Sequence, residues 1–435
     1  MFQDGILAQA VDEVAAAGVA YFSSAGNQPG SQAYDSAIRL VPASATAGSN
    51  CDFSNVDPAL YKGGFHNFAS GAAQDIAQTI HIDGSGIISF QWNEPYDALP
   101  TLGKVLQRGS GRLTTAKPTK TFPFAGTAGQ QIGITADAAP ASSNPLADVS
   151  ITLTGPNGDE IRFQDSTTLP ETLIAFLPVT GTYQIQIGGG PGGATGDFIY
   201  DVREASGTQV ESDFNLLFFG MDGKFLGYVG DNNRATNRPI EIAQVSPLPH
   251  TSEVQMVIAR ANTPAKRTPV ADRLRYVWFG GAQPQEFVDY TTPSTFGHSC
   301  AVGANGVAAY AFYPPFLPQT FTSSGPVTIY FDKSGSRLPE PDLRLKPDMA
   351  AMDGADTTFF GADAPQDPKG RPNFFGTSAA APHAGGIAAL MLQAAGGRGS
   401  LAPTAVRQTL QSSAFSHDLD PNHAGGVAQN SRSSV

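Results

Sequence analysis

The sequence contains little cysteine, tryptophan or charge. Of its 435 residues, two are cysteine, two are tryptophan and 15% are charged. Cys51 and Cys300 stand in no Cys-x-x-Cys pattern and have no histidine at ligand spacing, which argues against a zinc site. The two thiols could form one disulfide or remain reduced and partly buried, and the sequence favours neither alternative.

Basic clusters and long apolar runs are absent too. The formal net charge is −12, and lysine and arginine form no cluster or stripe. Nucleic acid and anionic membranes are therefore poor candidates for partners. No apolar run has the length of a membrane span, and the first residues, MFQDGILAQAVDEVAAAG, lack the basic region of a signal peptide.

Glycine, proline and apolar residues are abundant. The chain has 48 Gly and 33 Pro, and 41% of its residues are hydrophobic. This composition is typical of a globular protein with many turns and a large β component, and the length suffices for roughly two or three domains.

Apolar spacing divides the chain into three stretches. Residues 4–17 have helical spacing and end at Gly18. An apolar strand at 19–23 follows and leads to the loop SSAGN. Residues 1–61 are therefore predicted to begin an α/β layer. Residues 62–281 alternate apolar and polar residues between turns. They predict an antiparallel β-sandwich that hosts a second, nested sandwich at about 118–205, introduced by the linker TTAKPTKT.

The α/β character returns in residues 282–435. A short strand is expected in LRLKPDMAAMDG, followed by a helix at 376–395 that stops at Gly396-Gly397 and a second helix from Pro403. The fold class expected is therefore α/β, with a parallel-sheet core interrupted by a long all-β insertion.

Ser378 stands at the start of the 376–395 helix, in PNFFGTSAAAPHAGG. Free backbone N–H groups and the positive end of the helix dipole favour developing negative charge there. Ala379, Ala380 and Ala381 add little bulk, so another chain can come close. A bare Gly-Thr-Ser is most often only the cap of an ordinary helix, whereas the longer pattern is far more specific.

GTSAAAPHAGG resembles the nucleophile motif of the subtilisin-like serine proteases, or subtilases, and VAYFSSAGNQPG resembles their oxyanion loop. The resemblance implies that Ser378 is the nucleophile and that Asn27 and the Ser378 N–H stabilise the oxyanion. Ala25 and Gly26 would line the substrate pocket. The fold implied is a three-layer core around a parallel sheet, here incomplete. Asn27 also distinguishes the chain from sedolisins, which use an aspartate for the oxyanion.

Two further segments match the family in the expected order. FTSSGP (321–326) and KPDMAA (346–351) are similar to scaffold segments, whereas MDG (352–354) stands where many members have Ala-Pro-Gly. The match covers roughly 1–61 and 282–435. The β-rich insertion resembles the prepeptidase-type sandwich domains of secreted bacterial peptidases.

The aspartate and histidine motifs of a subtilase triad do not occur in this chain. Only 26 residues precede Asn27, and none of them is histidine. His383 is five residues beyond Ser378 and points to another face of the helix. The other histidines also read as structural: His66, His81, His250, His298, His417 and His423. We therefore expect little or no proteolytic activity from the chain as given, and we favour an N-terminally truncated subtilase over a non-catalytic remnant.

The resemblance also sets the remaining expectations. A serine endopeptidase acts on a polypeptide substrate, needs no cofactor and, in this family, is secreted. Subtilases often bind calcium, but GDNN (230–233) and DLDPN (418–422) match no calcium loop, so no metal site is assigned. The alternative is a binding or adhesion module. Exposed aromatics such as Trp92, Tyr96 and Trp278 would support it, although aromatic residues in strands usually belong to the core. The sequence does not indicate an oligomeric state.

Overall fold

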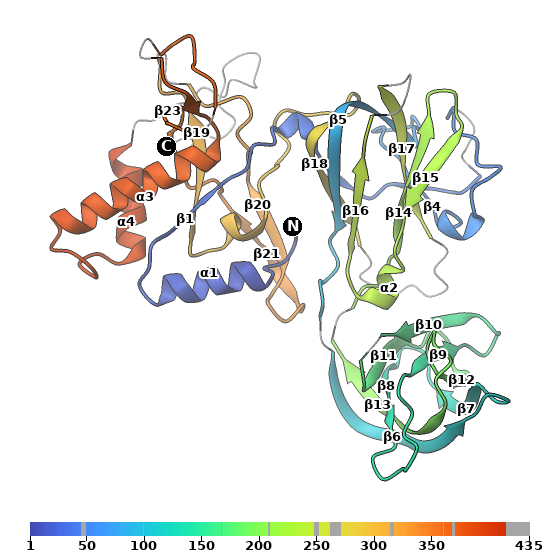
Figure 1. The fold of residues 1–435 in the computed structure, drawn as a ribbon. Helices are drawn as coiled ribbons and strands as arrows, with labels where there is room; N and C mark the ends of the chain where they lie inside the picture. The colour runs from blue at the N-terminus through green and yellow to red at the C-terminus, as the bar shows by residue number, and fades with distance from the viewer. Residues whose placement is uncertain are drawn as a thin grey trace.

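The computed structural model describes residues 1–44, 49–98, 100–166, 168–207, 209–247, 252–261, 271–313, 317–359, 361–367 and 370–414. The expectations for His250, His417, His423 and DLDPN lie outside these residues. Figure 1 shows an α/β part that contains both helix-rich ends of the described chain, and two β units beside it. Among the described residues, no helix combines the length and apolar character needed to cross a membrane.

The α/β part is built on a parallel sheet in the order β1-β19-β22. These strands are β1 (Tyr21–Ser24), β19 (Ala304–Tyr310) and β22 (Met349–Met352). Two helices cover opposite faces of this sheet. Neighbouring residues of a strand point to opposite sides, so successive side chains of β1 contact different helices. Tyr21 packs with helix α1 (Ile6–Ala16), whereas Phe22 packs with helix α3 (Thr377–Ala394). The α1 helix ends where predicted, with Gly18 at φ +92° directly after it.

Smaller elements complete this part. They are η1 (Gly30–Gln32), η3 (Gly297–Cys300), the hairpin β20 (Val327–Phe331) and β21 (Arg337–Arg344), the pair β23 (Ala355–Asp356) and β24 (Asn373–Phe374), and α4 (Pro403–Ser413). Helix α4 is tied to the sheet through Arg407, which donates to Asn305 Oδ1 at 2.8 Å and to Ala304 O at 2.6 Å.

We call the β unit that contains β5, β14 and β18 the outer β unit, because its strands come before and after the nested unit in sequence, and we call the nested unit the inner β unit. The outer β unit is one large hydrogen-bonded sheet that encloses its own core. Its central order is β15-β14-β17-β5-β18-β2, and β16, β4 and β3 add to it. The bounds are β2 (Ala33–Ala37), β3 (Leu40–Val41), β4 (Gly64–His66), β5 (Ala77–Trp92), β14 (Phe214–Gly220), β15 (Phe225–Val229), β16 (Ile240–Val245), β17 (Glu253–Arg260) and β18 (Arg273–Pro284), with η2 (Pro58–Leu60) and α2 (Asn233–Thr236) between strands.

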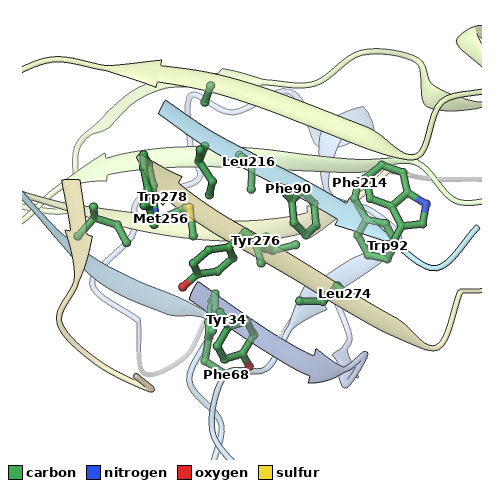
Figure 2. Close-up of a cluster of buried hydrophobic side chains, with 14 of the residues drawn as sticks. Tyr34, Phe68, Phe90, Trp92, Phe214, Leu216, Met256, Leu274, Tyr276 and Trp278 are labelled. Carbon is green, nitrogen blue, oxygen red and sulfur yellow. The ribbon is translucent and has the colours of Figure 1, made fainter. Parts of the chain in front are cut away.

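Aromatic side chains fill this core. Trp92 and Trp278 are completely buried, and Figure 2 shows Trp92 against Phe214 and Phe90. Tyr34 stacks on Tyr276 from the neighbouring strand at a ring distance of 5.3 Å. A second buried cluster lies on the opposite face of β14 and β17, where Leu217 and Val257 point away from Leu216 and Ile258, so these central strands are buried on both faces.

The inner β unit is a sandwich of two four-stranded antiparallel sheets. Their orders are β10-β9-β12-β7 and β11-β8-β13-β6, and one apolar cluster lies between them. The bounds are β6 (Thr101–Leu113), β7 (Thr119–Gly126), β8 (Gln131–Ala138), β9 (Ser150–Thr154), β10 (Glu160–Asp165), β11 (Glu171–Phe176), β12 (Gly181–Gly188) and β13 (Gly196–Ser206).

Strand pairing crosses the domain boundaries that the sequence predicts. Strands β2 and β3 precede residue 62, yet β2 pairs with β18 and β3 pairs with β4 in the outer unit. Strand β6 precedes residue 118, yet it pairs along β13 in the inner unit. The segment TTAKPTKT therefore contains the turn between β6 and β7, where Thr114 and Lys117 form a bridge, and does not connect two domains.

Two arginines join the inner unit to the outer unit. Arg162 of β10 donates to Val210 O at 3.0 Å, and Arg234 of α2 donates to Ile161 O at 2.8 Å. The guanidinium group of each arginine thus donates to a backbone carbonyl of the other β unit. Burial lowers the pKa of Arg162 to about 10, with the nearby Arg234 charge as a second cause. These two charge-assisted hydrogen bonds are contacts between the two units.

Candidate active site

The candidate site lies at the carboxyl end of the parallel sheet, where ligands bind in open α/β sheets. Asn27 follows β1, Asp353 follows β22, and the N-terminus of α3 brings Ser378 to the same edge. Asn27 is more than 300 positions away in sequence from both Asp353 and Ser378. Only the parallel pairing of β1 and β22 with β19 brings them together.

Ser378 is exposed on the first turn of α3. Among the described residues, neither its Oγ nor its N–H makes a hydrogen bond within the protein. The first N–H groups of a helix have no partner within the helix, and they carry the positive end of its dipole. The Ser378 N–H is therefore available to an anion, and its hydroxyl is available to a reacting group.

Asn27 is oriented by its contacts with Thr377. The Thr377 N–H donates to Asn27 Oδ1 at 2.9 Å, and the Thr377 hydroxyl donates to the same oxygen at 2.8 Å. The same hydroxyl accepts the Gly26 N–H at 3.2 Å. Two donors on Oδ1 decide which way the amide faces, so the Asn27 Nδ2 group points away from Thr377 with its protons free to donate.

Gly376 allows the two segments to approach. A side chain at this position would stand 3.3 Å from Asn27 Nδ2, and the backbone has φ +120°, where L-residues are strained. The glycine of the Gly-Thr-Ser motif is therefore required both by its backbone conformation and by the position of Asn27.

The loop after β1 is anchored by Ser323 from the segment FTSSGP. Ser323 N donates to Gly26 O at 2.9 Å, and its hydroxyl accepts the Gln28 N–H at 3.1 Å. A side chain on Gly26 would stand 2.6 Å from Ser323 Oγ, so only glycine fits. Ala25, the other residue predicted to line the substrate pocket, is buried, and its N–H continues the β1–β19 pairing by donating to Val307 O.

No histidine contacts Ser378 among the described residues. The His383 Nδ1 atom lies 2.5 Å from Met352 O, on the side of α3 that faces β22. His298 packs edge-on to Tyr21 in η3, and His66 is fully buried in the outer unit, where it contacts the Tyr34 hydroxyl at 2.9 Å. Burial lowers the pKa of His66 to about 3, so its ring is neutral.

Other residues singled out by sequence have structural surroundings. Cys51 and Cys300 are free and buried in different clusters. Trp92 and Trp278 are core residues, and Tyr96 is 37% exposed. In GDNN, the Asn232 side chain accepts the Ala235 N–H and caps α2. The described part of the chain holds no cluster of three or more His, Cys, Asp or Glu arranged for a metal ion.

Two site residues are not found by sequence reasoning. Thr377 is part of the motif, but its role in orienting Asn27 depends on a contact across 350 residues. Asp353 is visible only as a departure from Ala-Pro-Gly, and the structure places it completely buried beside Gly376. The departure was the available signal, because a carboxylate in place of a proline adds two acceptor oxygens.

The comparison with protein families matches a segment of the chain that contains the candidate nucleophile. The model of the Subtilase family matches residues 232–432, somewhat under half of the chain. This range contains Ser378 but not Asn27. The matched segment supports a serine-type peptidase function, for which a polypeptide is the substrate. No curated protein matches the chain.

Solved structures add no further argument. The chain is 12% identical to the Bacillus licheniformis lipase BlEst2 in its propeptide form, with 44% of this chain and 42% of the lipase covered and a TM-score of 0.16. It is 10% identical to the CUB1-EGF-CUB2 domain of human MASP-1/3, covering 40% and 99%, with a TM-score of 0.14. It is 12% identical to dimeric latent PorU from Porphyromonas gingivalis, covering 51% and 23%, with a TM-score of 0.13. At these scores no shared fold is indicated, and the chain spans less than half of the lipase.

Proposed function

We propose that the chain carries the nucleophile and the oxyanion donors of a subtilisin-like serine endopeptidase. In this proposal, Ser378 Oγ attacks the carbonyl carbon of a peptide bond while a base takes its proton. The Asn27 Nδ2 group and the Ser378 N–H hold the oxyanion, and the amine leaves with a proton as the acyl-enzyme forms. Water then attacks the ester and restores the hydroxyl.

One observation carries this proposal. Asn27 Oδ1 is occupied by both donors of Thr377, which leaves the Nδ2 donors free next to the unpartnered N–H and hydroxyl of Ser378. Asn27 and Ser378 are both exposed, so these donors and the hydroxyl are accessible to a substrate.

The general base is not assigned to any described residue. His383 is held by Met352 O, and no other described histidine lies at the sheet edge that carries Ser378. A serine hydroxyl without a base reacts slowly, so the proposal includes little or no peptide hydrolysis by the 435-residue chain alone. The oxyanion donors contribute to acylation only when a base is supplied that can take the proton of the Ser378 hydroxyl.

Added imidazole provides the experimental test. The purified chain is mixed with a p-nitrophenyl ester at neutral pH, with and without imidazole, and the acyl group on the protein is measured by mass spectrometry. We expect imidazole-dependent acylation that disappears in Ser378→Ala. Equal acylation of the wild-type chain and Ser378→Ala would overturn the proposal and move a binding module of the β units to first place.

A further inference from the structure

A buried carboxylate lies behind the nucleophile turn. Asp353 directly follows β22 and has no exposed surface. Its Oδ2 accepts the Gly376 N–H at 2.9 Å, and its Oδ1 accepts Gln319 Nε2 at 2.8 Å. Its own N–H donates to Tyr310 O at 3.0 Å, which fixes it to the end of β19. The carboxylate thus connects Gln319 to the residue that begins the Gly-Thr-Ser turn, while the backbone of Asp353 is held at the ends of β19 and β22.

The peptide group of Gly376 sets the geometry of that turn. Its carbonyl accepts the N–H groups of Ala379 at 2.9 Å and Ala380 at 3.2 Å, which starts helix α3. Its N–H faces the opposite way, toward Asp353. If this N–H lost its acceptor, the turn could rotate, because glycine at φ +120° has no side chain that opposes the motion.

The two donors around Asp353 match an ionised carboxylate, which only accepts hydrogen bonds. Burial raises the pKa of Asp353, while the two hydrogen bonds and the His383 charge from α3 lower it. A proline at this position, as in the Ala-Pro-Gly pattern, has no side-chain acceptor for the Gly376 N–H. The chain therefore places a buried carboxyl group where that pattern has a proline.

We propose that Asp353 is a positioning residue for the nucleophile, acting through the Gly376 N–H. Its carboxylate holds the turn so that Ser378 Oγ, the Ser378 N–H and Asn27 Nδ2 face one point. This inference rests on the proposed function for its catalytic meaning. Its structural part, the control of Ser378 and Asn27 by Asp353, is measurable in the absence of any reaction.

Three variants of the full chain separate positioning from folding. Asp353→Ala removes the acceptor, Asp353→Asn keeps an acceptor oxygen of the same shape, and Asp363→Ala removes an exposed carboxylate nearby as the matched control. In the imidazole assay, we expect Asp353→Ala to lose about 10-fold to 100-fold of the maximal acylation rate, with the half-saturating ester concentration unchanged. Asp353→Asn and Asp363→Ala should stay close to the wild-type rate. A wild-type rate in Asp353→Ala would overturn the proposal.

The second measurement is NMR of the chain labelled with ¹⁵N-glycine, ¹⁵N-serine and ¹⁵N-asparagine. We expect the Gly376 amide proton to shift with the ionisation of Asp353, and the Ser378 N–H and Asn27 side-chain signals to move in Asp353→Ala but not in Asp363→Ala. If the wild-type chain is not acylated but these signals move, the proposed function fails and the positioning role stands. If the signals of Ser378 and Asn27 are unchanged in Asp353→Ala, the positioning role is overturned whatever the acylation result.

Discussion

The outer β unit and the α/β part bury different kinds of side chains. The outer core contains both tryptophans of the chain together with tyrosine and phenylalanine rings. The fully buried residues of the cluster between α3 and the parallel sheet are Val307, Met349 and five alanines, which are Ala309, Ala351, Ala380, Ala381 and Ala384, and Phe22, Phe321 and Leu410 pack against it while partly exposed. Large buried aromatics contribute most to stability, whereas small residues let backbones come close. The candidate site therefore lies on a core of mostly small side chains.

Exposed apolar residues occur in both parts and do not distinguish them. Ile6 and Leu7 of α1 are 82% and 66% exposed, and Tyr228 and Ile242 of the outer unit are 53% and 60% exposed. The contrast lies in the buried side chains. If stability and chemistry are divided in this way, substitutions in the two parts should affect different measurements, and the following predictions test that division in order of expected size.

The largest effect is expected in the outer core. Phe214→Ala removes a buried ring that packs against Trp92 and Phe90. We expect a loss of about 3–5 kcal/mol in the free energy of unfolding of the outer unit, since the cavity cannot refill. Denaturant unfolding followed by tryptophan fluorescence measures this, because both tryptophans lie in this core. Imidazole-dependent acylation of Ser378 under native conditions should be unchanged, and a parallel loss of acylation would contradict the division.

Asn27 should show the reverse behaviour. Asn27→Ala removes the oxyanion donor, and we expect the acylation rate of Ser378 to fall about 10²-fold to 10³-fold with little change in unfolding. Asn27→Asp is the sharper variant at neutral pH, because it keeps an acceptor for Thr377 and replaces the amide donor with an ionised carboxylate that only accepts hydrogen bonds and repels the oxyanion. A rate within a factor of two of the wild-type value in Asn27→Asp would show that Asn27 does not stabilise the oxyanion.

The small-residue packing under α3 can be tested by adding bulk. Ala380 is completely buried against the sheet, whereas Ala389 is exposed on the same helix. We expect Ala380→Leu to lower the stability of the α/β part by about 1–3 kcal/mol through overpacking, and Ala389→Leu to have an effect within about 0.5 kcal/mol. Hydrogen exchange of the α3 amides measures both. Equal effects of the two variants would mean that the alanine interface is not close-packed.

The smallest effect is a pH dependence of the outer unit. Burial raises the pKa of Glu241 to about 8, with the charges of Asp231 and Asp213 adding to the shift, while Asn233 donates to the carboxyl oxygen. The native state therefore binds this proton more tightly than the unfolded chain. Its stabilising contribution is fully present near pH 4.5 and is lost as the pH rises to about 8.

Glu241→Gln removes this titration while it keeps the shape of the side chain. Relative to the wild-type protein, we expect the variant to gain stability on the order of 1 kcal/mol at pH 7 compared with pH 6. Urea unfolding at both pH values provides the measurement, and the difference between the two proteins cancels other titrating groups such as His66. An identical pH profile of variant and wild type would show that Glu241 ionises normally.

Local patterns predicted the local elements well. The helix before Gly18, the strand after it and the helix from Gly376 lie within two or three residues of their expected positions, because each has a clear apolar period and a glycine stop. The motifs around Asn27 and Ser378 also predicted the meeting of two distant segments. That meeting follows from the resemblance, since no periodicity within the chain connects residues 350 positions apart.

Long-range pairing and buried polar contacts could not be predicted. Strand β2 belongs to the outer unit only because Tyr34 and its neighbours pair with β18, about 240 residues later. Asp353 looks like a turn residue in Met-Asp-Gly, and its acceptor role depends on the Gly376 N–H that the fold brings to it. Sequence spacing cannot reveal either contact, because both are decided by the sheet order and not by neighbouring residues.

The most direct test of the account is to find which serine reacts. The chain is treated with a fluorophosphonate probe in the presence of imidazole, digested, and mapped by mass spectrometry. The account predicts one labelled serine, Ser378, with labelling strongly reduced in Asn27→Asp. Label spread over several serines, or on Ser378 at an equal rate in Asn27→Asp, would contradict the claim that Asn27 and Ser378 form one site.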